Sequence, residues 1–233
     1  MDNILPTKYL ELITPILLII IYISSFKGNK QVCDRYMINY FLYIITSICI
    51  YLLAGDKIKV KDDNMLLFIS FIGIIGLIFA FHYTSNIWLK HLIWISLVSL
   101  LGIAFKKVHE RYGETEIRSV ISKLMIILVI CIFIALMFPQ YIQPKMEVAL
   151  FFGLLIVIFL RIFDMLIFKS KYNTFISQLT IFIFSVFVIY DTNRVLRYSK
   201  ECVKDKLGPN YLGNVIDMFL NIINLFSNLL NLE

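Results

Sequence analysis

The chain has 233 residues, of which 60% are hydrophobic and 16% are charged, whereas a soluble domain usually has about 45–50% apolar and about 25% charged residues. A soluble globule of this length could not bury so much apolar surface, and a disordered chain would be polar and poor in aromatic residues. The net charge of +6 comes from short basic clusters between apolar runs, which argues against a nucleic-acid partner and predicts a multi-pass protein in a lipid bilayer.

Eight stretches of the chain reach the length of about 20 mostly apolar residues that a membrane-spanning helix needs. They are residues 9–26, 37–55, 65–83, 86–105, 117–138, 147–168, 174–196 and 211–232. Each stretch is continuously apolar, which favours helices over the alternating strands of a barrel. We therefore expect an all-α membrane helix bundle.

The first run, 9–26, is comparable in length to a signal-peptide core. Glu11 interrupts the region that should be basic, and no Ala-x-Ala-like cleavage site follows. We expect an uncleaved extra helix. The orientation of the bundle stays open, because ten Lys and Arg residues fall on the side that holds the loop 27–36 and the other twelve fall on the opposite side.

No catalytic or metal-binding motif is visible in the sequence. It has no Walker loop, GxSxG, HExxH or CxxC pattern, and its three histidines are scattered. The four cysteines show no paired spacing, and Cys49 and Cys131 are interpreted as small hydrophobic side chains within apolar runs. We expect a protein that is not an enzyme and has no cofactor.

The last run carries a polar stripe. Its members recur at steps of three and four residues and are Asn214, Asp217, Asn221, Asn224 and Asn228. Such a stripe must face the interior of the bundle or a watery cavity. Two interpretations are open: hydrogen bonds that hold helices together, or the wall of a pore with Asn214 and Asn224 as lining residues.

Three acids lie within apolar runs, where a carboxylate costs about 2.5–3.5 kcal/mol: Asp164, Asp191 and Asp217. Asp164 follows Arg161 by three residues, a spacing that predicts a structural ion pair on one helix face. If the last two runs form an antiparallel hairpin, Asp191 and Asp217 reach a similar depth. Two such carboxylates would share a proton, or bind a divalent cation such as calcium. The alternative is that Asp191 caps a helix end or pairs with Arg194.

Two strings near the end of the chain carry a family resemblance. Residues 189–193, with Tyr190, Asp191 and Thr192 at their centre, resemble the YDT signature of the transmembrane Bax inhibitor motif family. Residues 219–226 resemble its C-terminal YLDIINLF signature, and residues 73–81 are similar to the second helix of its viral and Golgi anti-apoptotic members.

The resemblance implies a seven-helix domain over 37–233, preceded by an extra N-terminal helix and loop over 1–36. It also implies a pH-sensitive calcium leak in the endoplasmic reticulum or Golgi membrane that suppresses apoptosis. The first acid of the family's pair carries over to Asp191. The second falls on Asn221, while Asp217 stands one helical turn earlier, so Asp191, Asp217 and Asn221 are the implied ion or proton switch.

This sequence departs from the family's pattern in a second way. Some relatives have a basic residue in the second helix that locks the closed state, and the run 65–83 has none; Arg161 and Arg194 are candidates to replace it. The competing hypothesis is a non-conducting protein that binds partner membrane proteins in cell-death control through its helix bundle.

Overall fold

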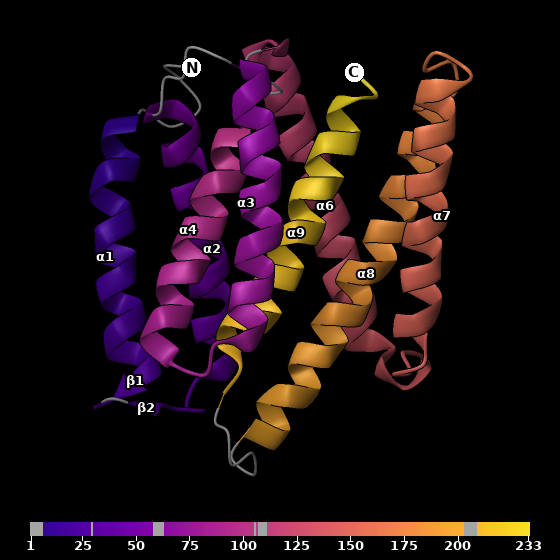
Figure 1. Cartoon of the computed structure of the whole chain (residues 1–233). Coiled ribbons are helices and arrows are strands. Elements are labelled where there is room, and N and C mark those ends of the chain that lie inside the picture. The colour runs from indigo at the N-terminus through magenta and orange to yellow at the C-terminus, as the bar shows by residue number, and fades with distance from the viewer. Residues whose placement is uncertain (1–6, 29, 58–62, 105, 107–110, 203–208) are drawn as a thin grey trace. The chain divides into compact units, whose positions relative to one another are not determined.

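The computed structural model describes residues 7–28, 30–57, 63–104, 106, 111–202 and 209–233. Within them the chain forms eight α-helices, a short 3-10 helix and a two-stranded hairpin (Figure 1). The helices are α1 Thr7–Ser25, α2 Tyr36–Lys57, α3 Asp63–Tyr83, α4 Ile87–Ala104, α6 Glu114–Met137, α7 Met146–Leu166, α8 Asn173–Glu201 and α9 Tyr211–Leu230. The 3-10 helix is η1 Pro139–Tyr141, and the strands are β1 Phe26–Lys27 and β2 Lys30–Gln31.

Each predicted apolar run is a helix, so the predicted all-α membrane fold is confirmed. Seven of the helices are long and apolar enough to cross a membrane, and α3 adds a shorter apolar stretch over Ile69–Tyr83. Residue 105, the end of the predicted run 86–105, lies outside the described residues. The helix α8 continues to Glu201, five residues beyond the predicted end at 196. The prediction stopped too early because the last turns of α8 are polar, and the length of an apolar run cannot locate a polar helix end.

The chain divides into two compact units. The first contains residues 1–114 and 202–216, and the second contains residues 115–201 and 217–233. The division therefore falls within α9, after Ile216. Because α1 belongs to the same unit as α2, α3 and α4, the predicted boundary at residue 36 does not coincide with this division; as a boundary of a family domain it stays a prediction.

In the first unit α2 packs against both α1 and α4, and α4 packs against α3 (Figure 1). Tyr43 and Trp94 are fully buried between these helices. The Tyr43 hydroxyl lies 2.7 Å from His91 Nε2, and Trp94 Nε1 donates to Ser47 at 3.0 Å. Aromatic rings whose polar tips find partners thus form much of this core. The connection from α1 to α2 contains the antiparallel hairpin β1–β2.

A disulfide joins Cys33 to Cys202 in this unit. The two residues are 169 positions apart, so no local spacing could reveal the bond. Cys49 and Cys131 are free and buried, which confirms their interpretation as small hydrophobic side chains.

The second unit contains α6, α7, α8 and the larger part of α9, with α7 packed against α8. Tyr190, Ala135 and Ile142 form a buried apolar cluster in it. At the C-terminal end, Glu233 accepts hydrogen bonds from Lys123 at 2.5 Å and Ser119 at 3.1 Å, and the bond from Lys123 holds the pKa of Glu233 below its usual range.

Candidate functional site

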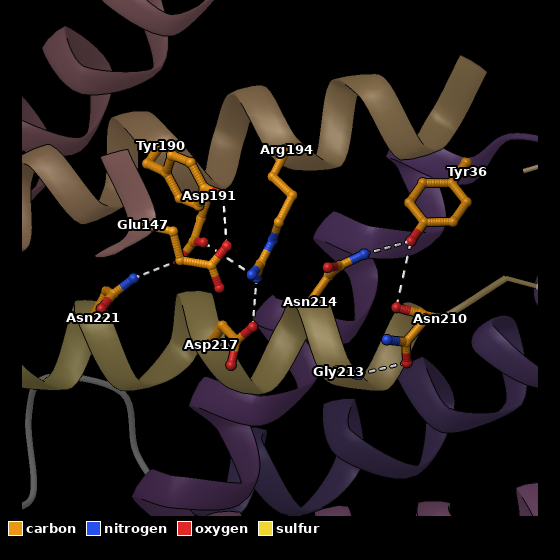
Figure 2. A network of polar contacts seen from close by, with 10 residues as sticks. All are labelled: Tyr36, Glu147, Tyr190, Asp191, Arg194, Asn210, Gly213, Asn214, Asp217 and Asn221. Carbon is orange, nitrogen blue, oxygen red and sulfur yellow. Dashed lines mark hydrogen bonds and ion pairs between the residues drawn. The ribbon is translucent and has the colours of Figure 1, made fainter. Parts of the chain in front are cut away.

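Four side chains of the predicted switch region meet in the second unit. Asp191 and Arg194 lie one helical turn apart on α8, and Asp217 and Asn221 lie one turn apart on α9. Residues three or four positions apart share a helix face, so each helix presents two polar groups in the same direction. Figure 2 shows these four side chains pointing toward one another.

Arg194 lies between the two carboxylates. Its Nη2 atom is 3.1 Å from Asp191 Oδ1 and also donates to Asp217 Oδ2. Asn221 Nδ2 donates to Asp191 Oδ2 at 2.7 Å (Figure 2). The side chains of Asp191 and Arg194 are 5% and 19% exposed, whereas that of Asp217 is 50% exposed. The cluster therefore runs from a buried acid, Asp191, through a mostly buried cation, Arg194, to a half-exposed acid, Asp217.

The structure thus brings together the three predicted residues Asp191, Asp217 and Asn221, but it pairs the two acids through Arg194 rather than with each other. The alternative pairing of Asp191 with Arg194 is also present. These two interpretations are compatible, because one guanidinium contacts both carboxylates. The role of the three residues as an ion or proton switch stays a prediction.

A further acid, Glu147, lies beside this cluster (Figure 2). It stands in the first turn of α7, and its Oε2 atom accepts a hydrogen bond from Tyr190 of α8 at 2.9 Å. Electrostatic interactions connect Glu147 with both Asp191 and Arg194. Sequence reasoning missed Glu147 because it stands at the end of an apolar run. The adjacent Tyr190, within the YDT string, was the available signal.

The arrangement can act as a releasable latch. Arg194 uses a single nitrogen for both carboxylates, and its Nε atom is buried without a hydrogen-bond partner in the described part of the chain. This pairing therefore lacks the parallel two-nitrogen geometry that makes arginine–carboxylate pairs strongest. The described residues contain no group of three or more His, Cys, Asp or Glu side chains suited to hold a metal ion; calcium binding at Asp191 and Asp217 stays a prediction.

The predicted pore-lining residues use their amide nitrogens within the protein. In the first unit, Asn214 Nδ2 donates to the Tyr36 hydroxyl at 2.8 Å, and that hydroxyl donates to the Asn210 carbonyl at 3.4 Å (Figure 2). In the second unit, Asn224 Nδ2 donates to the Leu220 carbonyl of its own helix at 2.8 Å. A pore-lining role for Asn214 and Asn224 stays a prediction, whereas the bond from Asn221 to Asp191 is of the helix-joining kind.

The predicted ion pair between Arg161 and Asp164 is not formed, although both residues are described. The Arg161 guanidinium donates to the neutral side chains of Asn173, Ser177 and Asn228 at 2.8–3.2 Å. Asp164 Oδ1 accepts the Tyr172 backbone N–H at 2.9 Å in the turn after α7. The prediction was wrong because both side chains find partners on α8, on α9 or in the turn, which i,i+3 spacing does not reveal.

Comparison with known proteins decides the family. A sequence model of the family described as "inhibitor of apoptosis-promoting Bax1" matches residues 10–232. The chain belongs to the Bax inhibitor family. No curated protein shows significant similarity to it.

The chain is accordingly a multi-pass integral membrane protein of the Bax inhibitor family, with apolar helices suited to a lipid bilayer. The matched region begins inside α1 and includes the cluster at Asp191 and Arg194. The family match confirms the resemblance seen in residues 189–193 and 219–226.

Proposed function

We propose that this Bax inhibitor family protein is a pH-sensitive cation leak, mainly for calcium, in the endoplasmic reticulum or Golgi membrane. By lowering the calcium content of the store, it would leave less calcium to release during a death signal and so dampen apoptosis. The observation that carries the proposal is the position of Arg194 between Asp191 and Asp217. The proposed activity is permeation, without covalent chemistry.

In this proposal Arg194 takes the place of a permeating cation. Its guanidinium compensates the two carboxylates that a divalent cation would otherwise contact, with the Asn221 amide as a neutral neighbour. A basic residue that locks the closed state, which the run 65–83 lacks, is thereby supplied from α8. Leak requires that Arg194 leave Asp191 and Asp217.

Protonation provides the release. The charged groups that act on Asp191 are Arg194 of α8, Asp217 of α9 and Glu147 of α7. Tyr190 of α8 donates a hydrogen bond to Glu147. When either carboxylate of the latch binds a proton, Arg194 loses one of its two ionic partners. The leak is therefore expected to increase as the pH falls.

The test is calcium flux into liposomes that contain the purified protein, measured from pH 8 to pH 5. A hydrogen bond to a charged group contributes about 1.5–3 kcal/mol, so Asp191→Asn is expected to raise flux at pH 8 about tenfold or more and to flatten the pH profile. Asp164→Asn is the matched control, because this buried acid of α7 lies outside the cluster; it should keep the wild-type profile. Absent flux, or a profile unaltered by both Asp191→Asn and Asp217→Asn, would refute the latch.

The second candidate function is a non-conducting protein that binds partner membrane proteins through its bundle. The observation that favours it is the use of Asn214, Asn221 and Asn224 in hydrogen bonds within the protein. The double substitution Asn221→Asp with Asp217→Asn restores the family's acid position. A gain of flux would identify the natural chain as a weakened channel, whereas no flux in either protein would favour the binding function.

A further inference from the structure

The Cys33–Cys202 disulfide lies at one defined end of the first unit. Cys33 stands in the connection between α1 and α2, and Cys202 directly follows α8. At this same end, Tyr211 at the start of α9 donates to the Val32 carbonyl at 2.6 Å, and Tyr36 at the start of α2 donates to the Asn210 carbonyl at 3.4 Å. We call this the disulfide end, defined by residues 30–36, 202 and 209–211.

The disulfide indicates which compartment the disulfide end faces. Its formation removes two electrons and two protons from the two thiols. The acceptor of these electrons is the disulfide of a dithiol–disulfide oxidoreductase, which reacts by thiol–disulfide exchange. One cysteine of the chain forms a mixed disulfide with the oxidoreductase. The second cysteine then displaces the oxidoreductase, which leaves as a dithiol. Such oxidants act in the secretory lumen and outside the cell, while cytosolic thiols are kept reduced.

The helix α1 places its first residue away from the disulfide end. It ends at Ser25, next to this end, so Thr7 lies about 28 Å away along the helix axis. Both residues belong to the first unit. This length matches the hydrocarbon thickness of a bilayer, about 30 Å.

We propose that the disulfide end faces an oxidising compartment, and that Thr7 lies on the cytosolic face of the membrane. The near balance of ten and twelve basic residues on the two sides could not decide this orientation. The inference does not depend on whether the protein conducts ions, because it uses only the disulfide and the course of α1.

Thiol counting in isolated membranes tests the bond. Denatured wild-type protein should react with a high-mass maleimide at two cysteines before reduction and at four after it, since Cys49 and Cys131 are free. Cys33→Ser should show three reactive thiols without reduction. Cys49→Ser is the matched control and should still gain two thiols on reduction. Four reactive thiols in unreduced wild type would overturn the proposal.

Sided reduction then tests the orientation. In sealed microsomes with the cytosolic face outward, a membrane-impermeant phosphine should leave the disulfide intact, whereas the same phosphine after detergent, or a permeant dithiol, should reduce it. An epitope tag added before residue 1 should be removed by protease in the sealed vesicles. Reduction by the impermeant reagent without detergent, or protection of the tag, would overturn the proposal.

Discussion

Arg194 is the residue on which the charged cluster depends. It contacts a buried acid, Asp191, and a half-exposed acid, Asp217. The i,i+3 spacing on α8 allowed the first contact to be foreseen from the sequence, because residues at that spacing share a helix face. The second contact could not be foreseen, since it depends on how closely α8 and α9 approach at one position.

Arg194→Gln is expected to destabilise the protein through Asp191. Removing one partner of a buried ion pair leaves an uncompensated charge and costs about 3–5 kcal/mol. Unfolding in detergent, followed by circular dichroism, measures the loss. Asp217→Asn is the comparison, because a pair with a half-exposed acid contributes about 0–1 kcal/mol. Equal losses for the two variants would contradict this account.

The loss in Arg194→Gln should also depend on pH. Once Arg194 is absent, the buried Asp191 carboxylate has no ionic partner, and binding a proton removes its charge. The variant is therefore expected to recover stability relative to wild type as the pH falls, and the two unfolding curves measured at pH 8 and pH 5 should converge. A difference that is constant across this range would count against a charged Asp191 as the cause.

Arg161 is a residue whose partners the i,i+3 spacing did not predict. Its guanidinium joins α7 to Asn173 and Ser177 of α8 and to Asn228 of α9, so Arg161→Gln is expected to cost about 1.5–3 kcal/mol. In double-mutant cycles, coupling with Asn228→Ala should exceed coupling with Asp164→Asn, because Asn228, unlike Asp164, accepts a hydrogen bond from Arg161. Lys169→Gln, on the exposed turn, should change stability by less than about 0.5 kcal/mol.

At the scale of elements, helical periodicity grouped the polar residues of α9 on one stripe. Asp217, Asn221 and Asn228 all contact polar side chains of α7 or α8 in the second unit. What periodicity could not provide was the identity of these partners, because it describes one helix and not its neighbours. The hydrogen bonds that join helices are seen directly, whereas a pore wall stays a prediction.

The close contact between α2 and α4 gives a prediction at this scale. A Cβ atom at Gly102 would overlap the Tyr51 carbonyl group, and a Cβ at Gly55 would lie 3.0 Å from the Gly102 carbonyl oxygen. Gly102→Ala must therefore push the two helices apart, at a cost of about 1–3 kcal/mol.

Gly76→Ala in α3 is the matched control for Gly102→Ala. Nothing lies within 4 Å of its added Cβ, and replacing a helical glycine by alanine favours the helix by about 0.5–1 kcal/mol. Thermal unfolding of both variants checks the difference in sign. Similar melting temperatures for the two would show that α2 and α4 separate without cost.

At the scale of the whole molecule, the disulfide closes the longest covalent loop seen in the described residues, between positions 169 apart. A bond of this kind restricts the unfolded chain and typically contributes about 2–4 kcal/mol. Reduction is therefore expected to lower the melting temperature in detergent. The double variant Cys33→Ser with Cys202→Ser should melt at the lower temperature with or without reductant. A wild-type protein insensitive to reductant would contradict the expected contribution.

The sequence by itself determined the membrane class, the eight helices and the family, because the length of an apolar run, its continuity and the two C-terminal signatures are local properties of the chain. It also selected Asp191, Asp217 and Asn221. Only the tertiary structure decided that Arg194 separates the two acids, that Arg161 binds neutral partners and that Cys33 bonds to Cys202. Each of these depends on the approach of segments far apart along the chain, and no local pattern records that distance.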